Sequence, residues 1–137
     1  MTQSSPRNHV TTTWRLAAPN RLAYVSSSGA SAVVIGGRRW DRNGRGPWVA
    51  SAQTPLQVPG AWWGPQPIDA RAIGWTTVGG ARARLVTFFD PSLPGWYEAA
   101  IAPRTARPLT LRMTTGAHFM RHRYTGFDRP LRIVPPS

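Results

Sequence analysis

The sequence contains no cysteine and no lysine, and only five of its 137 residues are acidic. Without cysteine the chain forms no disulfide bond and has no site for a thioether-linked lipid anchor. No run of 18 or more apolar residues is present, so no segment has the length of a transmembrane helix. The first residues, MTQSSPRNH, also lack the apolar stretch of a secretory signal.

Motifs of the common enzyme classes are missing as well. The sequence has no G-x-S-x-G nucleophile elbow, no Walker phosphate loop and no H-E-x-x-H zinc motif. Gly36-Gly37 and Gly79-Gly80 do not open helices, so these pairs are interpreted as turn or bulge glycines rather than phosphate cradles. We therefore expect a protein that is not an enzyme.

Arginine supplies all 17 basic residues and gives the chain a formal charge of +12. Such an excess is typical of proteins that bind nucleic acid or an anionic membrane surface. The arginines are scattered, however, and alanine, glycine and proline are also abundant, which is the composition expected from a GC-rich genome. A solvated basic surface is therefore favoured over a dedicated nucleic-acid footprint, which needs clustering.

The length and composition indicate one folded domain. Hydrophobic residues make up 41% of the chain and seven residues are tryptophan, which is enough apolar surface for a core. We expect residues 1–8 to be a disordered or added leader and residues 9–137 to form a single β domain. Turn signals recur about every eight to twelve residues, as in antiparallel β folds.

Apolar and β-branched runs between these turns predict the strands. The expected ranges are 11–17, 21–27, 30–37 with 38–41 continuing it, 69–78, 81–90, 95–103, 107–115 and 117–127, with one short strand within 129–136. Asn43-Gly44 and Gly79-Gly80 predict tight hairpin turns. The proline-interrupted stretch 50–67 predicts a loop or a short helix, because proline excludes a central strand.

Both faces of the predicted strands are partly apolar. In ARARLVTFFD, residues 81–90, one face carries Leu85 and Phe89, and the other carries Val86 and Phe88 beside two arginines. A sheet with one wetted face would divide more sharply. The predicted fold class is therefore mainly β: a curved, unclosed antiparallel sheet, or half-barrel, with the Trp/Pro-rich loop or short helix as a lid.

Four segments stand in a characteristic order: APNRLAYV (18–25), AVVIGGRRWDR (32–42), GWYEAAIAPRTARPLTLRMT (95–114) and YTGFDRPLRIVPP (124–136). This order resembles the periplasmic lipoprotein-carrier superfamily, which includes the LolA and LolB carriers and the LppX and LprG-type lipoproteins. The resemblance implies a non-catalytic, extracytoplasmic domain that lacks the N-terminal helix and first strands and belongs to a longer, membrane-anchored chain. Ala18 stands where LolA carriers have an arginine, so the gating mechanism of those carriers does not transfer.

The resemblance also implies that a lipid or other apolar small molecule is held in the concave face. Burial of apolar surface contributes about 25 cal/mol per Å² to such binding. The candidate wall residues are Trp14, Tyr24, Val33, Ile35, Trp40, Trp75 and Leu85, with Trp62 and Trp63 at the lid. The arginines would then lie near an anionic membrane surface, where each contributes about 1 kcal/mol.

The stretch GAHFMRHRY places His118, Met120 and His122 at alternate positions. On a strand these side chains share one face, and imidazole and thioether groups favour copper. Met113 on the neighbouring strand adds a second sulfur if the register allows. Residues 117–136 also resemble the ends of bacterial membrane proteins similar to CopC and CopD. The alternative function is a copper-binding accessory domain of a transporter, and the structural alternative is that Met120 packs while the histidines bond or face water.

A third hypothesis is a platform for single-stranded nucleic acid. Arg82 and Arg84 share a strand face, as do Arg121 and Arg123, and aromatic residues lie near both pairs. Phe88 and Phe119 also suit the core, so this hypothesis ranks below lipid binding.

Overall fold

A computed structural model describes residues 2–5, 8–58, 60–61 and 63–137. These residues form antiparallel strands and no helix, so none of them provides a helix of the length and hydropathy needed to cross a membrane. The chain divides into two compact units, and each is described by itself. Unit 1 comprises Met1–His9 with Ala61–Phe127, and unit 2 comprises Val10–Gly60 with Asp128–Ser137.

Unit 1 contains a sheet in the order β1-β11-β10-β9-β8-β7. The strands are β1 (Thr2–Ser5), β7 (Ile68–Val78), β8 (Ala81–Asp90), β9 (Gly95–Ile101), β10 (Pro108–Thr114) and β11 (Phe119–Arg123). Residues 2–5, which we expected to belong to a leader, pair with β11. No pairing among the described residues joins β7 to β1, so the mainly β, unclosed antiparallel class is confirmed.

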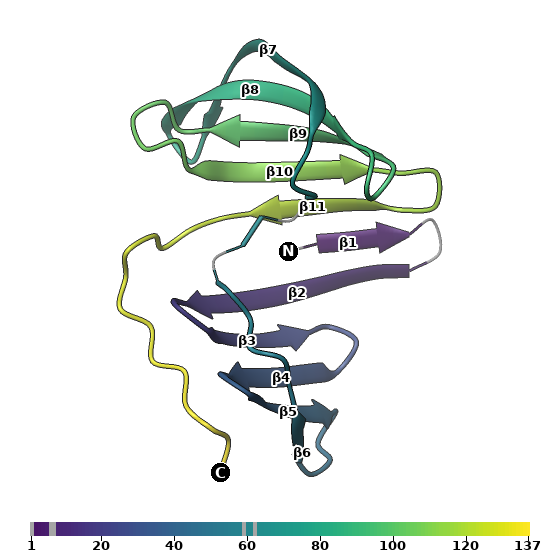
Figure 1. The fold of residues 1–137 in the computed structure, drawn as a ribbon, viewed down its shortest axis with the longest axis vertical. Coiled ribbons are helices and arrows are strands. Elements are labelled where there is room, and N and C mark those ends of the chain that lie inside the picture. Colours follow the sequence, from purple (N-terminus) through teal and green to yellow (C-terminus); the bar gives the residue numbers. More distant parts are fainter. Residues whose placement is uncertain (1, 6–7, 59, 62) are drawn as a thin grey trace. The chain divides into compact units, whose positions relative to one another are not determined.

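The β7–β8 hairpin is bent along its length (Figure 1). Its turn is made by Gly79 and Gly80, whose φ angles of 56° and 81° require the freedom of glycine. The pairing register of β7 against β8 shifts twice, between residues 68 and 71 and between residues 72 and 74. Such bulges bend a strand and increase its twist, which gives this end of the sheet its curvature.

One face of the unit 1 sheet, which we call the core face, is packed. Its buried centre consists of Phe88, Tyr97, Ala99, Leu111 and Met113. The rings of Phe88 and Tyr97 stack with centroids 5.1 Å apart, and the edge of Trp63 contacts Phe88 at a centroid distance of 5.2 Å. Trp63 therefore belongs to the hydrophobic core of unit 1.

A buried carboxylate fixes the loop that carries Trp63. One Asp90 oxygen accepts a hydrogen bond from the Gly64 N–H at 2.7 Å, and the other accepts the Ser92 N–H at 2.9 Å and the Ser92 hydroxyl at 2.6 Å. The Ser92 hydroxyl, followed by the Gly64 N–H, lowers the pKa of Asp90. A side chain at Gly64 would collide with Ser92, so glycine allows the close approach.

Unit 2 contains a sheet in the order β6-β5-β4-β3-β2. The strands are β2 (Asn8–Ala17), β3 (Arg21–Ser26), β4 (Ala30–Ile35), β5 (Arg38–Asn43) and β6 (Val49–Ala52). The predicted hairpin at Asn43-Gly44 is confirmed, since β5 pairs with β6 and Gly44 has a φ of 56°. The small core of unit 2 includes Leu22, Ala32 and Val34.

Three predicted segments differ from the structure. The strand expected over 30–37 with 38–41 as its continuation is the β4–β5 hairpin, because the chain turns at Gly36-Gly37. Residues 129–137 form no strand, because Pro130, Pro135 and Pro136 cannot donate ladder hydrogen bonds. Ile133 is nevertheless buried, and its carbonyl accepts a hydrogen bond of 2.9 Å from Arg21. In the stretch 50–67, residues 50–52 belong to β6, and the described residues from 53 to 67 form a loop rather than a helix.

Candidate binding site on the hollow face of unit 1

The face of the unit 1 sheet opposite the core face, which we call the hollow face, carries an exposed row of aromatic side chains. The antiparallel register aligns Phe89, Trp96, Thr114 and Phe119 across four strands. The rings of Phe89 and Trp96 lie 5.4 Å apart between centroids. Trp96 is 53% exposed and Phe119 is 48% exposed, so this aromatic row is not a core.

A row of polar and charged side chains lies beside the aromatic row, two residues away along each strand. It consists of Thr87, Glu98, Arg112 and Arg121. An Arg112 nitrogen lies 3.6 Å from a Glu98 oxygen, an ion pair that water screens because both side chains are exposed. Arg112 and Arg121 are direct cross-strand partners, and like charges in that position destabilise a sheet.

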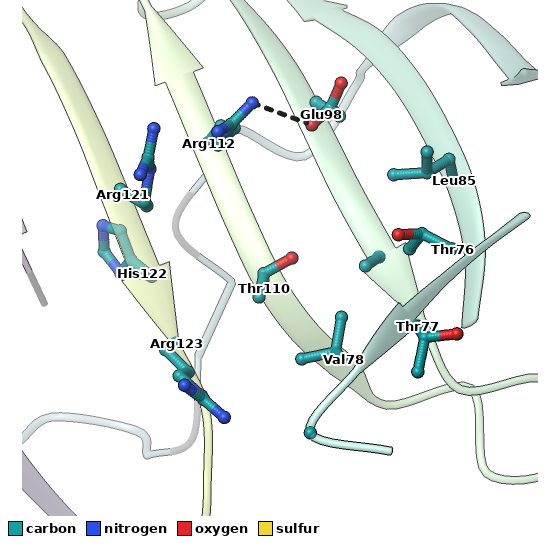
Figure 2. A pocket seen from close by; sticks show the side chains of 12 residues that line it. Thr76, Thr77, Val78, Leu85, Glu98, Thr110, Arg112, Arg121, His122 and Arg123 are labelled. Carbon is teal, nitrogen blue, oxygen red and sulfur yellow. Dashed lines mark ion pairs between the residues drawn. The ribbon is translucent and has the colours of Figure 1, made fainter. Parts of the chain in front are cut away.

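The third row borders a hollow of about 480 Å³. The row consists of Leu85, Ala100, Thr110 and Arg123. The hollow is lined by Thr76, Thr77, Val78, Gly79, Leu85, Glu98, Ala100, Thr110, Arg112, Arg121, His122 and Arg123 (Figure 2). An Arg123 nitrogen lies 3.3 Å from the position that a Cβ at Gly79 would occupy, so the Arg123 guanidinium reaches the β7–β8 turn.

The lining of this hollow suits an anion. Three arginines face it and Glu98 is the one carboxylate among the lining residues, which leaves an excess of positive charge. Threonine hydroxyls line the same space. Guanidinium groups bind phosphate and carboxylate through short, charge-assisted hydrogen bonds, and hydroxyls supply further donors.

A second hollow, of about 630 Å³, lies in unit 2 and has a different charge balance. It is lined by Tyr24, Ser28, Ala30, Ser31, Asp41, Arg42, Asn43, Gly46, Pro47 and Val49. Arg39 donates two hydrogen bonds of 2.7 Å to Asp41, and this pairing raises the pKa of Arg39. The carboxylate of Asp41 is thus already matched by an arginine.

The residues predicted as one cavity wall are divided between the two units. Leu85 lines the hollow of unit 1, and Tyr24 lines the hollow of unit 2. Trp14 packs on Tyr24 with ring centroids 4.6 Å apart. The register places Val33, Ile35 and Trp40 on the opposite face of the unit 2 sheet from Tyr24. Trp75 lies on the core-face side of the β7–β8 hairpin, opposite Arg84. Of the two predicted lid residues, Trp63 packs in the core of unit 1, and Trp62 lies outside the described residues.

The His/Met stripe lies largely against the core. Met120 and His122 share the core face, although His122 also borders the hollow at the edge of its lining. Met113 is the direct cross-strand partner of Met120, so the register brings a second sulfur to this stripe. His122 is 3% exposed, and burial lowers its pKa to about 4. His118 precedes β11 in a turn, where its carbonyl accepts the Thr115 N–H at 3.0 Å.

These groups match copper in chemical type. A neutral imidazole and thioether sulfurs are ligands that copper accepts. In the part of the chain that the structure describes, no three His, Cys, Asp or Glu residues lie close enough to hold a metal ion together. A copper site would therefore depend on the methionine sulfurs.

Sequence reasoning found the hollow face only in part. It grouped Arg121 with Arg123 as one side of a nucleic-acid platform and named Leu85 as a wall residue, but it did not join these residues to the rows of the neighbouring strands. The signal was present in part, because Phe119, Arg121 and Arg123 alternate along one strand, as do Trp96 and Glu98 along another. The sequence of one strand does not reveal the pairing register, and only the register aligns these residues in rows across neighbouring strands.

Comparison with known proteins gives no family for this geometry: no protein-family model matches the chain, and no curated protein matches it in sequence. The resemblance to lipoprotein carriers stays a prediction.

Proposed function

We propose that unit 1 is a non-catalytic binding domain that holds an anionic amphiphile, such as a lipid with a phosphate or carboxylate head group, on its hollow face. The observation that carries this proposal is the pairing of Arg112 with Arg121 on the hollow face, with Arg123 lining the same hollow. An anionic head group between these guanidinium groups relieves their repulsion and forms charge-assisted hydrogen bonds.

The aromatic row supplies the apolar part of the site. Alternate residues on a strand are about 7 Å apart, so Trp96 and Phe119 lie one such step from the arginine row. An acyl chain that buries about 100 Å² on these rings gains about 2.5 kcal/mol. The proposed ligand is therefore a lipid, as the sequence predicts, but one with a negatively charged head group. The extracytoplasmic location is also proposed, and it rests on the family resemblance.

Calorimetric titration with single-chain detergents below their micelle concentrations tests this function. Dodecyl phosphate should bind with one-to-one stoichiometry, and dodecyl maltoside should bind far more weakly. Arg112→Gln with Arg121→Gln should abolish the preference for dodecyl phosphate. Arg104→Gln, which changes an exposed arginine in the turn after β9, is the matched control.

The proposal would be contradicted if the two detergents bound equally, or if the double variant kept the preference of the wild type. Native mass spectrometry of the purified protein adds a direct search for retained lipid.

A second candidate is binding of single-stranded nucleic acid, favoured by the presence of exposed aromatic and arginine rows on one sheet face. Bases stack on aromatic rings, and the backbone follows a basic groove. Titration of a fluorescent oligothymidine at several salt concentrations separates the candidates. Tight binding with a steep salt dependence would replace the amphiphile, and weak binding would remove this candidate.

The third candidate is a copper-binding accessory domain, favoured by the pairing of Met113 with Met120 on the face that carries His122. Calorimetry with Cu(I) and with Cu(II) tests it. A stoichiometric heat that disappears in His118→Ala with His122→Ala would support copper binding, and the absence of such a heat would exclude this candidate.

A further inference from the structure

The β7–β8 hairpin carries a second cationic cluster, on the opposite side of the sheet from the hollow. The guanidinium carbon of Arg82 lies 3.9 Å from the centroid of the Trp75 ring, and that of Arg84 lies 4.9 Å from it. Trp75 is 46% exposed despite both contacts. We call Trp75, Arg82 and Arg84 the hairpin patch.

The hairpin patch is wholly basic in its local sequence. Residues 70–89 contain three arginines and no acidic residue, and the two acids of the hairpin, Asp69 and Asp90, stand at its ends. Cation–π contacts hold Arg82 and Arg84 against the indole, so their charges are fixed beside an exposed aromatic ring. Ile73, two residues before Trp75 on the same strand, is also highly exposed. This combination of exposed apolar side chains and unbalanced positive charge is not needed for the core of unit 1.

We propose that the hairpin patch is a docking site for an anionic lipid surface. Tryptophan prefers the boundary between head groups and acyl chains, and arginine keeps its charge among the phosphates while its stem lies against apolar groups. Negative lipid head groups complement the charge of residues 70–89.

A nucleic acid fits this patch less well. A base binds an aromatic residue by stacking on a free ring face. At the Trp75 ring, Arg82 already occupies a position 3.9 Å over the centroid, which is the place of a stacked base. The exposed part of the indole suits insertion between lipids better than base stacking.

The hairpin patch is separate from the site of the proposed function. Trp75 and Arg84 are cross-strand partners on one face, whereas Leu85 points into the hollow on the other. The inference therefore stands without the amphiphile, and variants on the two faces can be compared directly.

Co-sedimentation with lipid vesicles tests the inference. At low salt, vesicles of one part phosphatidylglycerol to three parts phosphatidylcholine should bind the protein at least tenfold more tightly than vesicles of phosphatidylcholine alone. Arg82→Gln with Arg84→Gln should weaken binding to the anionic vesicles about 10- to 30-fold. Trp75→Ala should weaken it further when added to this double variant.

Arg45→Gln with Arg104→Gln is the matched control, because it removes the same charge from two exposed turns outside both proposed sites. It should leave binding to the anionic vesicles within about twofold of the wild type. Equal losses in the two double variants would show a response to net charge alone and would overturn the docking site. Equal binding to both vesicle types, or tight oligothymidine binding lost in Arg82→Gln with Arg84→Gln, would also overturn it. Circular dichroism on each variant verifies that the fold is retained.

Discussion

The core face and the hollow face of unit 1 are built from the same strands, but their central side chains differ in burial and in charge. On β9, Tyr97 is buried in the core, whereas its neighbours Trp96 and Glu98 lie on the hollow face. On β10, Leu111 is buried and Arg112 is exposed. Because side chains alternate along a strand, one set of these residues packs in the core and stabilises the fold, and the other set lies on the surface, where it is available for binding.

The arginines of the two units also differ in whether a carboxylate of the protein pairs with them. In unit 2, Arg39 is held by a bidentate bond to Asp41, so its charge is satisfied within the protein. In unit 1, Arg121 faces Arg112, whose carboxylate contact with Glu98 is long. Charge that is paired internally supports the fold, and charge that opposes like charge is stabilised where an anion binds between the two groups.

The largest expected effect comes from the core face. Leu111→Ala removes a fully buried side chain and should lower the free energy of unfolding by about 2–5 kcal/mol, because a cavity remains among Phe88, Tyr97 and Met113. Urea denaturation measures this loss. Under conditions where the variant stays folded, its affinity for dodecyl phosphate should equal that of the wild type, and a large loss of affinity would break the separation of the two faces.

The next effect belongs to the hollow face. Arg112→Gln with Arg121→Gln should weaken dodecyl phosphate binding about 30- to 100-fold, which corresponds to about 2–3 kcal/mol. The same variant should unfold at the same urea concentration as the wild type or slightly above it, because two opposed charges are removed. A marked fall in the urea midpoint would show that these arginines support the fold.

The core face should also show a pH dependence through His122. Burial lowers its pKa to about 4, below the ordinary value of 6.5, so the unfolded chain binds a proton first as the pH falls. Its contribution to stability is complete above about pH 6.5 and is lost between about pH 6.5 and 4, on the order of 3 kcal/mol. Urea midpoints measured across this range should fall for the wild type and for Met120→Leu, but less for His122→Leu. Equal slopes in all three proteins would refute the assignment.

The smallest effect is expected at the aromatic row. Trp96→Ala removes a half-exposed ring and should weaken dodecyl phosphate binding about five- to tenfold, while the free energy of unfolding changes by less than about 1 kcal/mol. Octyl phosphate, which has a shorter chain, should lose less affinity than dodecyl phosphate. An equal loss for both detergents would place the acyl chain away from this row.

Local patterns predicted the strands well because their signals are local. The range 81–90 is bounded by a Gly-Gly turn and by Asp90, and it matches β8 in full. The strand expected after residue 129 failed because its prolines outweigh the apolar pattern of its sequence. Residues 2–5 carry no apolar alternation, so only pairing with β11 makes them a strand.

The candidate site could be predicted only in part. The alternation of Phe119, Arg121 and Arg123 is visible in the sequence, but their partners Thr114, Arg112 and Thr110 come from another strand through the register. Conversely, Val33 and Tyr24 both looked like wall residues, and pairing places them on opposite faces of the unit 2 sheet. Aromatic and aliphatic residues suit either face of a sheet, so composition does not decide which face they occupy.

The sequence by itself determined an antiparallel β protein without cysteine chemistry, with a large arginine excess and with turns at its glycine pairs, because these depend on residue type and on contacts between near neighbours. Tertiary structure alone decided which alternate residues became a core and which became the arginine and aromatic rows, and it opened the hollow beneath β7. The reason is physical: the pairing register is set by the summed burial of several strands at once, and a shift of one residue moves every side chain to the other face.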